Sequence, residues 1–340
     1  MYKKLFGAMP DGKEINLYTF KNEEAELTLM ELGAAIYSFR PYGRDIIGGF
    51  DTLEDYLTDD SNQGLSIGRV ANRISGASFT LDGVVYKLPK NDGENCLHGG
   101  DGYGHKVWEV VNYNESSIRF RYNSRDGEDG FPSSLMAYVR YTLIGAAVMI
   151  EYEAIPDGKT PINLTNHSYF NLDGFGGKIT DHTAVIYADR YTEVDTNLIP
   201  NGNRPAVVGT VFDFTEPHKI GERIGCGFVG YDHNYLLKPT RYGVFKGIEL
   251  PLAAEVWNSD LKMSVYTDQE GVQFYIGNFL SSAPIMRGGV KAIQHGGFCL
   301  EAQCEPDAPN RNEAIYSQGE RYSSTTVYKV EKIHKSIFNT

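Results

Sequence analysis

Three segments of this sequence hold a histidine or a glutamate in surroundings where the side chain could take part in proton transfer. They are residues 95–100 with His98, residues 165–174 with His167, and residues 298–310 with Glu301. His98 precedes two glycines that let a ligand or another chain segment come close. Glu301 follows an apolar stretch, where a carboxylate is costly to bury unless a hydrogen bond or a cation compensates. Histidine and glutamate are the usual acid–base groups of enzymes, but most copies are structural, so both readings stay open for each segment alone.

A serine between two glycines offers a nucleophile as an alternative. Ser66 in Gly64-Leu65-Ser66-Ile67-Gly68 matches the G-x-S-x-G elbow, which requires a strand before it and a helix after it. Residues 69–73 show no helical pattern, so we interpret Ser66 as a serine in a glycine-flanked loop. The glycine-rich run 99–104 lacks the Gly-Lys-Ser/Thr ending of a phosphate-binding loop and is also expected to be a loop.

A metal site would need clustered ligands, and one stretch near the C-terminus contains candidates. These are His295, Cys299, Glu301 and Cys304. Their spacing matches no recognised tetrahedral pattern, and in a strand Cys299 and Glu301 share a face while Cys304 need not. We therefore expect no metal and no cofactor.

Turn-forming dipeptides organise the whole chain. Asp-Gly begins at positions 11, 82, 92, 101, 126, 129, 157 and 173, and Asn-Gly at 201. Such dipeptides favour turns with positive φ. Apolar and polar residues alternate over 118–122 and 148–154, which predicts half-buried antiparallel strands. The pattern also predicts a hairpin over 79–88 around Asp82-Gly83, a short helix near 52–57, and a closing strand over 325–333.

The fold class that follows is mainly β, a large antiparallel β-sandwich with a few short helices. No repeated strand–helix alternation that would build a parallel sheet is present. More strands are expected than one open sheet usually holds, so they should divide into packed sheets. The turns continue from end to end with no linker and no shift in composition, which predicts a single domain over residues 1–340.

Composition argues against several classes of protein. The 340 residues include 44 acidic and 32 basic side chains, a net charge of −12, and no long basic run, so nucleic acid is not an expected partner. No stretch approaches the roughly 20 apolar residues that span a bilayer, and the N-terminus lacks the apolar part of a signal peptide, so no membrane partner is expected. Four cysteines are too few for a disulfide scaffold and indicate reduced thiols and a cytoplasmic location. They are Cys96, Cys226, Cys299 and Cys304.

Taken together, the motifs resemble the aldose 1-epimerase (mutarotase) family. The matching segments keep the family's order across nearly the whole chain: 68–74, 95–100, 165–172, 231–233, 300–303 and 306–310. The resemblance implies a galactose mutarotase-like supersandwich with a sugar cleft on one face. It also implies an isomerase that interconverts the α and β anomers of free aldohexoses such as D-glucose and D-galactose.

The resemblance also implies roles for individual residues. Glu301 looks like the general base, His167 the general acid, and His98 a partner at the ring oxygen or a neighbouring hydroxyl. The residues expected to bind or position the sugar are Arg73, Asp232, Asn72 and Gln303. Aromatic side chains that could lie under the ring are Trp108, Trp257, Phe274 and Tyr275, although most of these are expected to be core.

Opening a cyclic hemiacetal needs one base and one acid, because the hydroxyl on C1 loses a proton while the ring oxygen gains one. Ionised Glu301 and protonated His167 suit these steps, and rotation about the C1–C2 bond before reclosure produces the other anomer. The pair predicts a bell-shaped pH profile, with the acidic limb set by the glutamate and the basic limb by the histidine.

Three other functions fit parts of the sequence. A hexose-phosphate epimerase should show arginines and lysines facing the cleft, whereas Arg69 and Arg73 are close without forming an evident cluster. A non-catalytic carbohydrate-binding protein would have lost turnover, against which the intact Glu301 and His167 argue. A glycosidase would use two carboxylates, for which Glu301 and Asp232 are conceivable. The expected partner is a monosaccharide; the preferred aldose and the formation of a homodimer stay undecided.

Overall fold

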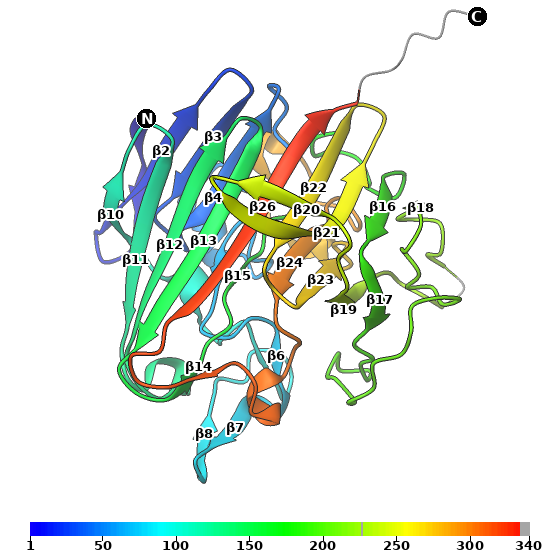
Figure 1. Ribbon diagram of the computed structural model, residues 1–340. Coiled ribbons are helices and arrows are strands. Elements are labelled where there is room, and N and C mark those ends of the chain that lie inside the picture. Colours follow the sequence, from blue (N-terminus) through cyan, green and yellow to red (C-terminus); the bar gives the residue numbers. More distant parts are fainter. Residues whose placement is uncertain (226, 334–340) are drawn as a thin grey trace, which may run out of the picture.

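The computed structural model describes residues 1–225 and 227–333, and β-strands dominate these ranges (Figure 1). The three largest sheets have four, ten and four strands, and the strand pairs within them are antiparallel. Within the described ranges, no helix has the length and apolar character needed to cross a bilayer.

Two of these sheets form the layers of a sandwich. The N-terminal sheet has the order β1-β2-β3-β4, with bounds β1 Tyr2–Ala8, β2 Glu14–Lys21, β3 Ala25–Met30 and β4 Ala35–Pro41. The larger sheet runs β10-β11-β12-β13-β26-β22-β21-β16-β18, and β20 pairs with β21 off this path. Its strands are β10 Glu109–Tyr113, β11 Ser117–Ser124, β12 Leu135–Ile144, β13 Ala147–Pro156, β26 Tyr322–Lys332, β22 Leu261–Thr267, β21 Ile248–Trp257, β16 Thr183–Ile186, β18 His218–Lys219 and β20 Tyr242–Phe245.

The remaining strands in the described ranges form one more four-stranded sheet and four two-stranded sheets. The second four-stranded sheet has the order β17-β19-β23-β24, with bounds β17 Ala188–Tyr191, β19 Asp232–Leu237, β23 Gly271–Tyr275 and β24 Cys299–Gln303. The two-stranded sheets pair β5 Ser66–Ile67 with β15 Thr165–Asn166, β6 Arg73–Ile74 with β9 Cys96–Leu97, β7 Ser78–Leu81 with β8 Val84–Lys87, and β14 Thr160–Pro161 with β25 Ile315–Tyr316.

The core fills the space between the N-terminal sheet and the ten-stranded sheet. Figure 1 shows the blue strands of the first behind the cyan and green strands of the second. Phe20 and Leu27 of one layer and Phe120 and Ile150 of the other belong to one buried cluster. Burial of such apolar surface is the main force that holds two sheet faces together. The predicted mainly β fold, a large antiparallel sandwich with few short helices, is therefore confirmed.

The alternating segments form the strands that the sequence predicts, with one informative difference. In β11, Ile118 and Phe120 are buried, while Arg119 is half-buried. In β13, Met149 is buried as well as its inward neighbours, because Phe245 of the β20–β21 hairpin packs over that face. The sheet is thus covered on both sides where this hairpin crosses it (Figure 1).

The predicted local elements also appear. Strands β7 and β8 form the expected hairpin, and Asp82 (φ 50°) and Gly83 (φ 81°) both adopt the left-handed backbone that such tight turns use. The predicted helix is α1, Leu53–Thr58, whose N-cap Thr52 accepts a hydrogen bond from the Asp55 N–H at 3.2 Å. The closing strand is β26, which begins three residues earlier than predicted.

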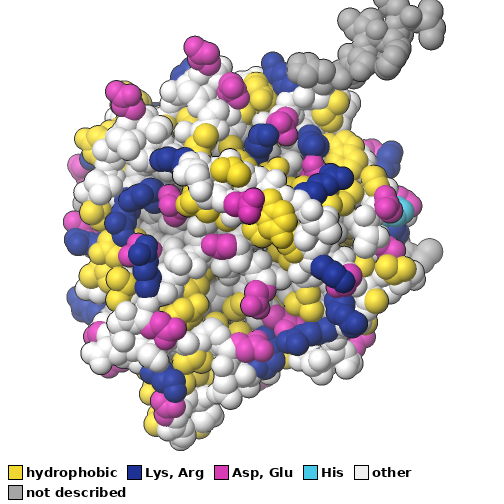
Figure 2. All heavy atoms as spheres, viewed as in Figure 1, with side chains coloured by type: hydrophobic (Ala, Val, Ile, Leu, Met, Phe, Trp, Pro, Cys, Tyr) yellow, Lys and Arg dark blue, Asp and Glu magenta, His cyan; other side chains and the backbone are white. Residues whose placement is uncertain are grey.

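Charges of both signs are interspersed on the face seen in Figure 2. Examples on the ten-stranded sheet are the pairs Arg121–Glu109 at 2.6 Å and Arg119–Glu153 at 3.3 Å. Glu109 and Arg121 lie on the paired strands β10 and β11, whereas Arg119 of β11 reaches Glu153 of β13 across β12. Surface pairs of this kind stabilise a sheet only modestly. They leave the surface of this sheet mixed in charge rather than basic.

The cysteines in the described ranges are free thiols. Cys96 and Cys299 are buried and Cys304 is half-buried. Cys226 lies outside the described residues.

Candidate active site

One cavity of about 260 Å³ brings most of the sequence-predicted site residues together. Those that line it are Asn72, Arg73, His98, His167, Asp232 and Glu301. Gln303 is not among the lining residues: it is fully buried, and its Nε2 donates a hydrogen bond to the Cys304 carbonyl at 3.3 Å. The structure therefore assembles six of the seven residues from motifs that are distant in the chain.

The small sheet β17-β19-β23-β24 positions the two carboxylates. In its registers Gln273 of β23 lies opposite Glu301 of β24, and Tyr275 lies opposite Asp232 of β19. Gln273 Nε2 donates a hydrogen bond to Asp232 Oδ1 at 2.7 Å. Strand β23 thus sets the spacing between the carboxylates and holds one of them in orientation.

His167 is held by backbone bonds on both sides. Its N–H donates to the Leu65 carbonyl at 2.9 Å, and its own carbonyl accepts the Gly64 N–H at 3.0 Å. Three residues later, Phe170 and Phe298 exchange backbone hydrogen bonds of 2.7 and 2.9 Å. The second contact joins the His167 segment to the start of β24, so the imidazole comes to lie beside Glu301.

His98 and Asn72 face each other at the ends of strands β9 and β6. Both adopt left-handed backbone, with φ of 56° and 63°. The His98 N–H donates to the Asn72 carbonyl at 3.1 Å, and the Asn72 N–H donates to His98 Nδ1 at 3.2 Å. The neighbouring Gly99 is needed because a Cβ there would lie 2.5 Å from the Gly68 carbonyl oxygen.

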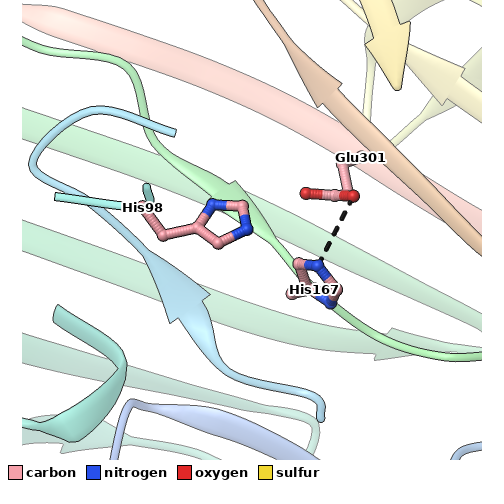
Figure 3. Close-up of side chains that lie close together, drawn as sticks. All are labelled: His98, His167 and Glu301. Carbon is pink, nitrogen blue, oxygen red and sulfur yellow. Dashed lines mark ion pairs between the residues drawn. The ribbon is translucent and has the colours of Figure 1, made fainter. Parts of the chain in front are cut away.

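Glu301, His167 and His98 form a compact group (Figure 3). Glu301 Oε1 lies 3.6 Å from His167 Nε2, and both side chains are almost fully buried, with 2% and 7% exposed. The His98 and His167 rings are 5.2 Å apart between centroids and nearly perpendicular. Glu301 Oε2 is buried without a hydrogen-bond partner among the described residues. A buried carboxylate oxygen left unpaired is costly, so it is well suited to receive a hydroxyl of a bound molecule.

The same three residues are the group within the described ranges that could hold a metal ion, since their ligand atoms lie within 4.8 Å of one another. The hydrogen bond to His98 argues against that use. Its Nδ1 accepts a hydrogen bond from the Asn72 N–H, so in the neutral ring Nε2 carries the hydrogen and acts as a donor. The stretch around His295 offers no alternative: His295 Nε2 lies 3.1 Å from the Val229 carbonyl, and this histidine is absent from the group of close ligand atoms.

Burial acts on the charge states of this group. It raises the pKa of Glu301 well above its usual value, and the nearby carboxylate of Asp232 raises it further, while Arg73 lowers it. Burial lowers the pKa of His167 to about 4. Burial, together with His167 and Arg73, also holds the pKa of His98 well below 6.5. The favoured state is a protonated Glu301 beside a neutral His167. In this state the pair carries one transferable proton, and that proton is on the carboxyl group.

Arg73 is the one basic side chain other than histidine that lines the cavity within the described ranges. Its Nε donates to Asp92 Oδ2 at 2.8 Å, and its Nη1 lies 4.0 Å from Asp232 Oδ2. Together with Asp60 and Glu301, Asp92 and Asp232 give the wall four carboxyl groups against one guanidinium. Such a wall suits neutral hydroxyl groups rather than a phosphate.

Arg69, close to Arg73 in sequence, has a different role. It is 2% exposed and donates to the carbonyls of Pro132 and Ser133 at 2.7 and 2.9 Å. It also donates to the hydroxyls of Thr160 and Ser124 at 3.0 and 2.7 Å. Arg69 therefore binds parts of the protein interior and does not join Arg73 in an anion site.

Ser66 lies in strand β5 rather than in the loop that we predicted. Its hydroxyl is buried and lies 3.1 Å from the Tyr141 hydroxyl and 3.0 Å from that of Tyr152. The residues directly after the motif, all of them described, form no α-helix, and Ser66 does not line the cavity. The serine is structural, as the absence of a helical pattern indicated.

The cavity also contains residues that the sequence did not single out. They are Asp60, Ser61, Asn62, Asp92, Leu97, Tyr169, Phe279 and Ser282. Tyr169 follows His167 by two residues, so extended backbone would have placed both on one side. Asp92 was read only as part of a turn, and no local pattern marks Gln273 behind Asp232. Of the four aromatic candidates, Tyr275 lines the cavity, Trp108 and Phe274 are core residues, and the half-buried Trp257 is not among the lining residues.

Comparison with known proteins places the chain in a family. A family model described as aldose 1-epimerase matches residues 16–329. The chain belongs to the aldose 1-epimerase family. A galactose mutarotase from Bos taurus is 38% identical, with 96% of this chain and 97% of the relative covered. An aldose 1-epimerase from Escherichia coli K12 is 37% identical, with 94% and 96% covered.

Solved structures agree with this membership. A galactose 1-epimerase from Lactobacillus acidophilus matches with a TM-score of 0.86 at 26% identity, and the match covers 98% of this chain and 99% of the other. An aldose epimerase homologue from Caenorhabditis elegans gives a TM-score of 0.85 at 26% identity, with 94% and 99% covered. The aldose 1-epimerase family inferred from the motifs is therefore confirmed.

Proposed function

We propose that this aldose 1-epimerase family member is a mutarotase that interconverts the α and β anomers of free aldohexoses such as D-glucose and D-galactose. The observation that carries the proposal is the 3.6 Å contact between Glu301 and His167 in the wall of one polar cavity. An acid and a base this close can act on the two oxygens attached to C1 of one sugar. The relatives named above support the same reaction class.

In the proposed reaction Glu301 acts on the C1 hydroxyl and His167 on the ring oxygen. The Glu301 carboxylate removes the hydroxyl proton while the His167 imidazolium donates a proton to the ring oxygen. The bond between C1 and the ring oxygen breaks, and C1 becomes an aldehyde carbon. After rotation about C1–C2, the hydroxyl formed from the ring oxygen attacks the other face of the aldehyde. Its proton returns to His167, and the new C1 hydroxyl takes its proton back from Glu301.

The burial of the pair is compatible with these roles because only the position of one proton changes. A protonated Glu301 with a neutral His167 and an ionised Glu301 with a protonated His167 hold the same number of protons. Arg73 lowers the pKa of Glu301 and so favours the ionised carboxylate. The ion-pair form is therefore reached without proton exchange with solvent.

The other lining residues bind the sugar in this proposal. His98 donates from Nε2 to the ring oxygen or to a neighbouring hydroxyl. Arg73 and Asp232 bind hydroxyls, and Asn72 orients His98 through its backbone N–H. Gln303 does not contact the sugar in this proposal. It ends strand β24, which carries Glu301, and helps to position that strand.

The rival functions receive less support. A sugar phosphate would meet Arg73 among four acidic side chains of the described wall: Asp60, Asp92, Asp232 and Glu301. A glycosidase would need Asp232 as a second catalytic carboxylate, but Gln273 donates a hydrogen bond to it at 2.7 Å and Arg73 lies 4.0 Å away, whereas Glu301 has His167 as its close acid–base partner. We infer further that residues 1–340 form one domain. A cytoplasmic location stays a prediction, and the formation of a homodimer stays undecided.

Anomeric equilibration of a pure anomer tests the function directly. Freshly dissolved α-D-glucose or α-D-galactose is mixed with the protein, and the C1 proton signals are followed by NMR. We expect equilibration faster than in buffer for the free sugars and little effect on glucose 6-phosphate. If neither free sugar is accelerated, the protein is a binding module rather than an epimerase.

A further inference from the structure

Strand β24 contacts both nitrogens of the His167 ring. Glu301 Oε1 lies 3.6 Å from Nε2, and the Sγ of Cys299 lies 3.7 Å from Nδ1. Cys299 and Glu301 are two positions apart in this strand, so their side chains leave it on the same face. The first contact belongs to the proposed reaction, which makes no use of the second.

Cys299 is held in place by its strand and is shielded from solvent. It is fully buried, does not line the cavity, and in the register of the small sheet lies opposite Tyr275 of β23. Burial raises the pKa of its thiol well above the ordinary value, and the nearby acidic residues Glu301 and Asp232 raise it further. The sulfur therefore stays an uncharged thiol, which can act as a weak donor or a weak acceptor of hydrogen bonds.

Proton transfer at Nε2 decides which tautomer of His167 is needed. In the favoured state Glu301 is protonated and His167 is neutral. The carboxyl group can pass its proton to Nε2 only if this nitrogen has a free lone pair, and the hydrogen of the neutral ring must then be on Nδ1. The side chain at hydrogen-bond distance from Nδ1 is that of Cys299, so its sulfur is the acceptor.

We propose that Cys299 is a positioning residue, whose sulfur accepts the Nδ1–H of His167 and keeps Nε2 free to exchange a proton with Glu301. The inference rests on the proposed function, because it assigns a role in the proton transfer between these two residues. His98 is held in the opposite tautomer, since its Nδ1 accepts the Asn72 N–H. Nε2 of His98 therefore donates a hydrogen bond, whereas Nε2 of the neutral His167 accepts a proton.

Nitrogen-15 NMR of the ring nitrogens reads the tautomer without any turnover. A ring nitrogen that carries hydrogen is well separated in chemical shift from one that does not, and the signals of His167 are identified by their absence from the spectrum of His167→Gln. At neutral pH we expect the wild-type ring to carry its hydrogen on Nδ1. Cys299→Ala removes the acceptor and should increase the share of the Nε2–H tautomer, whereas Cys299→Ser keeps an acceptor and should retain the Nδ1–H form.

Rates of anomeric equilibration test the consequence for catalysis. Cys299→Ala should lower kcat for D-galactose about three- to tenfold, because a hydrogen bond that orients the ring is lost. KM should change less than about twofold, since Cys299 does not line the cavity. Cys299→Ser should restore most of the rate. Cys304→Ala is the matched control with unchanged kcat, because this half-buried thiol directly follows β24 and is not among the lining residues.

The outcomes separate this inference from the function on which it rests. Hydrogen on Nε2 in the wild-type ring overturns the inference and leaves the mutarotase function standing, as does a tautomer that does not respond to Cys299→Ala. Equal losses of kcat in Cys299→Ala and Cys299→Ser assign the residue to packing and also overturn it. The tautomer is read on folded protein, so a lower stability of one variant cannot imitate the expected shift. If the wild-type protein accelerates neither D-glucose nor D-galactose, the proposed function itself is refuted, while the spectrum still reports the tautomer.

Discussion

The imidazole of His98 accepts the backbone N–H of Asn72 through Nδ1 at 3.2 Å, so its Nε2 carries the hydrogen. Burial keeps this ring neutral, because it lowers the pKa of His98 well below 6.5. The residue is therefore a fixed hydrogen-bond donor and not an exchanger of protons. This distinguishes it from His167, whose Nε2 faces the Glu301 carboxylate.

A glutamine can replace that donor, whereas an alanine cannot. We expect His98→Ala to lower kcat/KM about 100-fold, since a hydrogen bond to the developing charge is lost, and His98→Gln to lose clearly less. Steady-state equilibration rates with D-galactose measure both. Equal losses in the two variants would show that His98 does more than donate a hydrogen bond.

Glu301→Gln should reduce kcat by about 100- to 10,000-fold, because the amide cannot accept the proton of the C1 hydroxyl. The far-ultraviolet circular dichroism and the urea midpoint should stay close to those of the wild type. Glu270→Gln, on the exposed turn before β23, is the matched control and should keep full activity. Full activity in Glu301→Gln would exclude this residue as the base.

The pH profile of kcat/KM should be bell-shaped, with limbs that belong to the Glu301–His167 pair. The structure reverses the assignment that the sequence suggests. Because the pKa of His167 is lowered to about 4, the acidic limb reports the protonation of its imidazole, which gives the pair a second transferable proton. Because the pKa of Glu301 is raised, base removes the last proton from the carboxyl. A rate that is constant from about pH 4 to about pH 9 contradicts this account.

Two charge-removing variants should move the basic limb in opposite directions. Asp232 raises the pKa of Glu301, so Asp232→Asn should shift the limb to lower pH. Arg73 lowers that pKa, so Arg73→Gln should shift it to higher pH. Both should also lower kcat/KM about 10- to 100-fold through lost hydroxyl contacts. Limbs that shift together, or not at all, would show that Glu301 does not control the basic side.

Arg69→Leu should destabilise the fold by about 3–5 kcal/mol, because a buried cation and its partners lose their hydrogen bonds. Chemical unfolding in urea measures the loss, and the exposed Arg125→Leu serves as the control with little change. The folded fraction of Arg69→Leu should keep kcat within a few-fold of the wild type. A selective loss of catalysis at unchanged stability would place Arg69 in the reaction instead.

Much of the fold was predictable because its signals are local. The Asp82-Gly83 hairpin, the alternation in β11 and the short helix α1 depend on neighbours within a few residues. The burial of Met149 was not predictable, since it depends on the distant β20–β21 hairpin. Single strands can be read from their own pattern, but the covering of a second face depends on tertiary packing.

Most of the predicted site residues line the cavity, but their protonation states and hydrogen-bond partners could not be predicted from the sequence. Motif resemblance named six lining residues, but it also named Gln303, which shares the strand of Glu301 and lies off the wall. The tautomer of His98 and the support of Asp232 by Gln273 come from contacts between distant segments. No periodicity within one segment carries that information.

Arg69 and Arg73 are only four positions apart, but the guanidinium of Arg69 lies in the protein interior and that of Arg73 lines the cavity. Residues 69–73 are therefore a poor place for substitutions meant to change the sugar preference. A backbone shift that moves Arg73 would also disturb the hydrogen bonds of Arg69. Sugar preference is more readily changed at the exposed part of the cavity wall, where Phe279 and Ser282 can be substituted without disturbing the hydrogen bonds of Arg69.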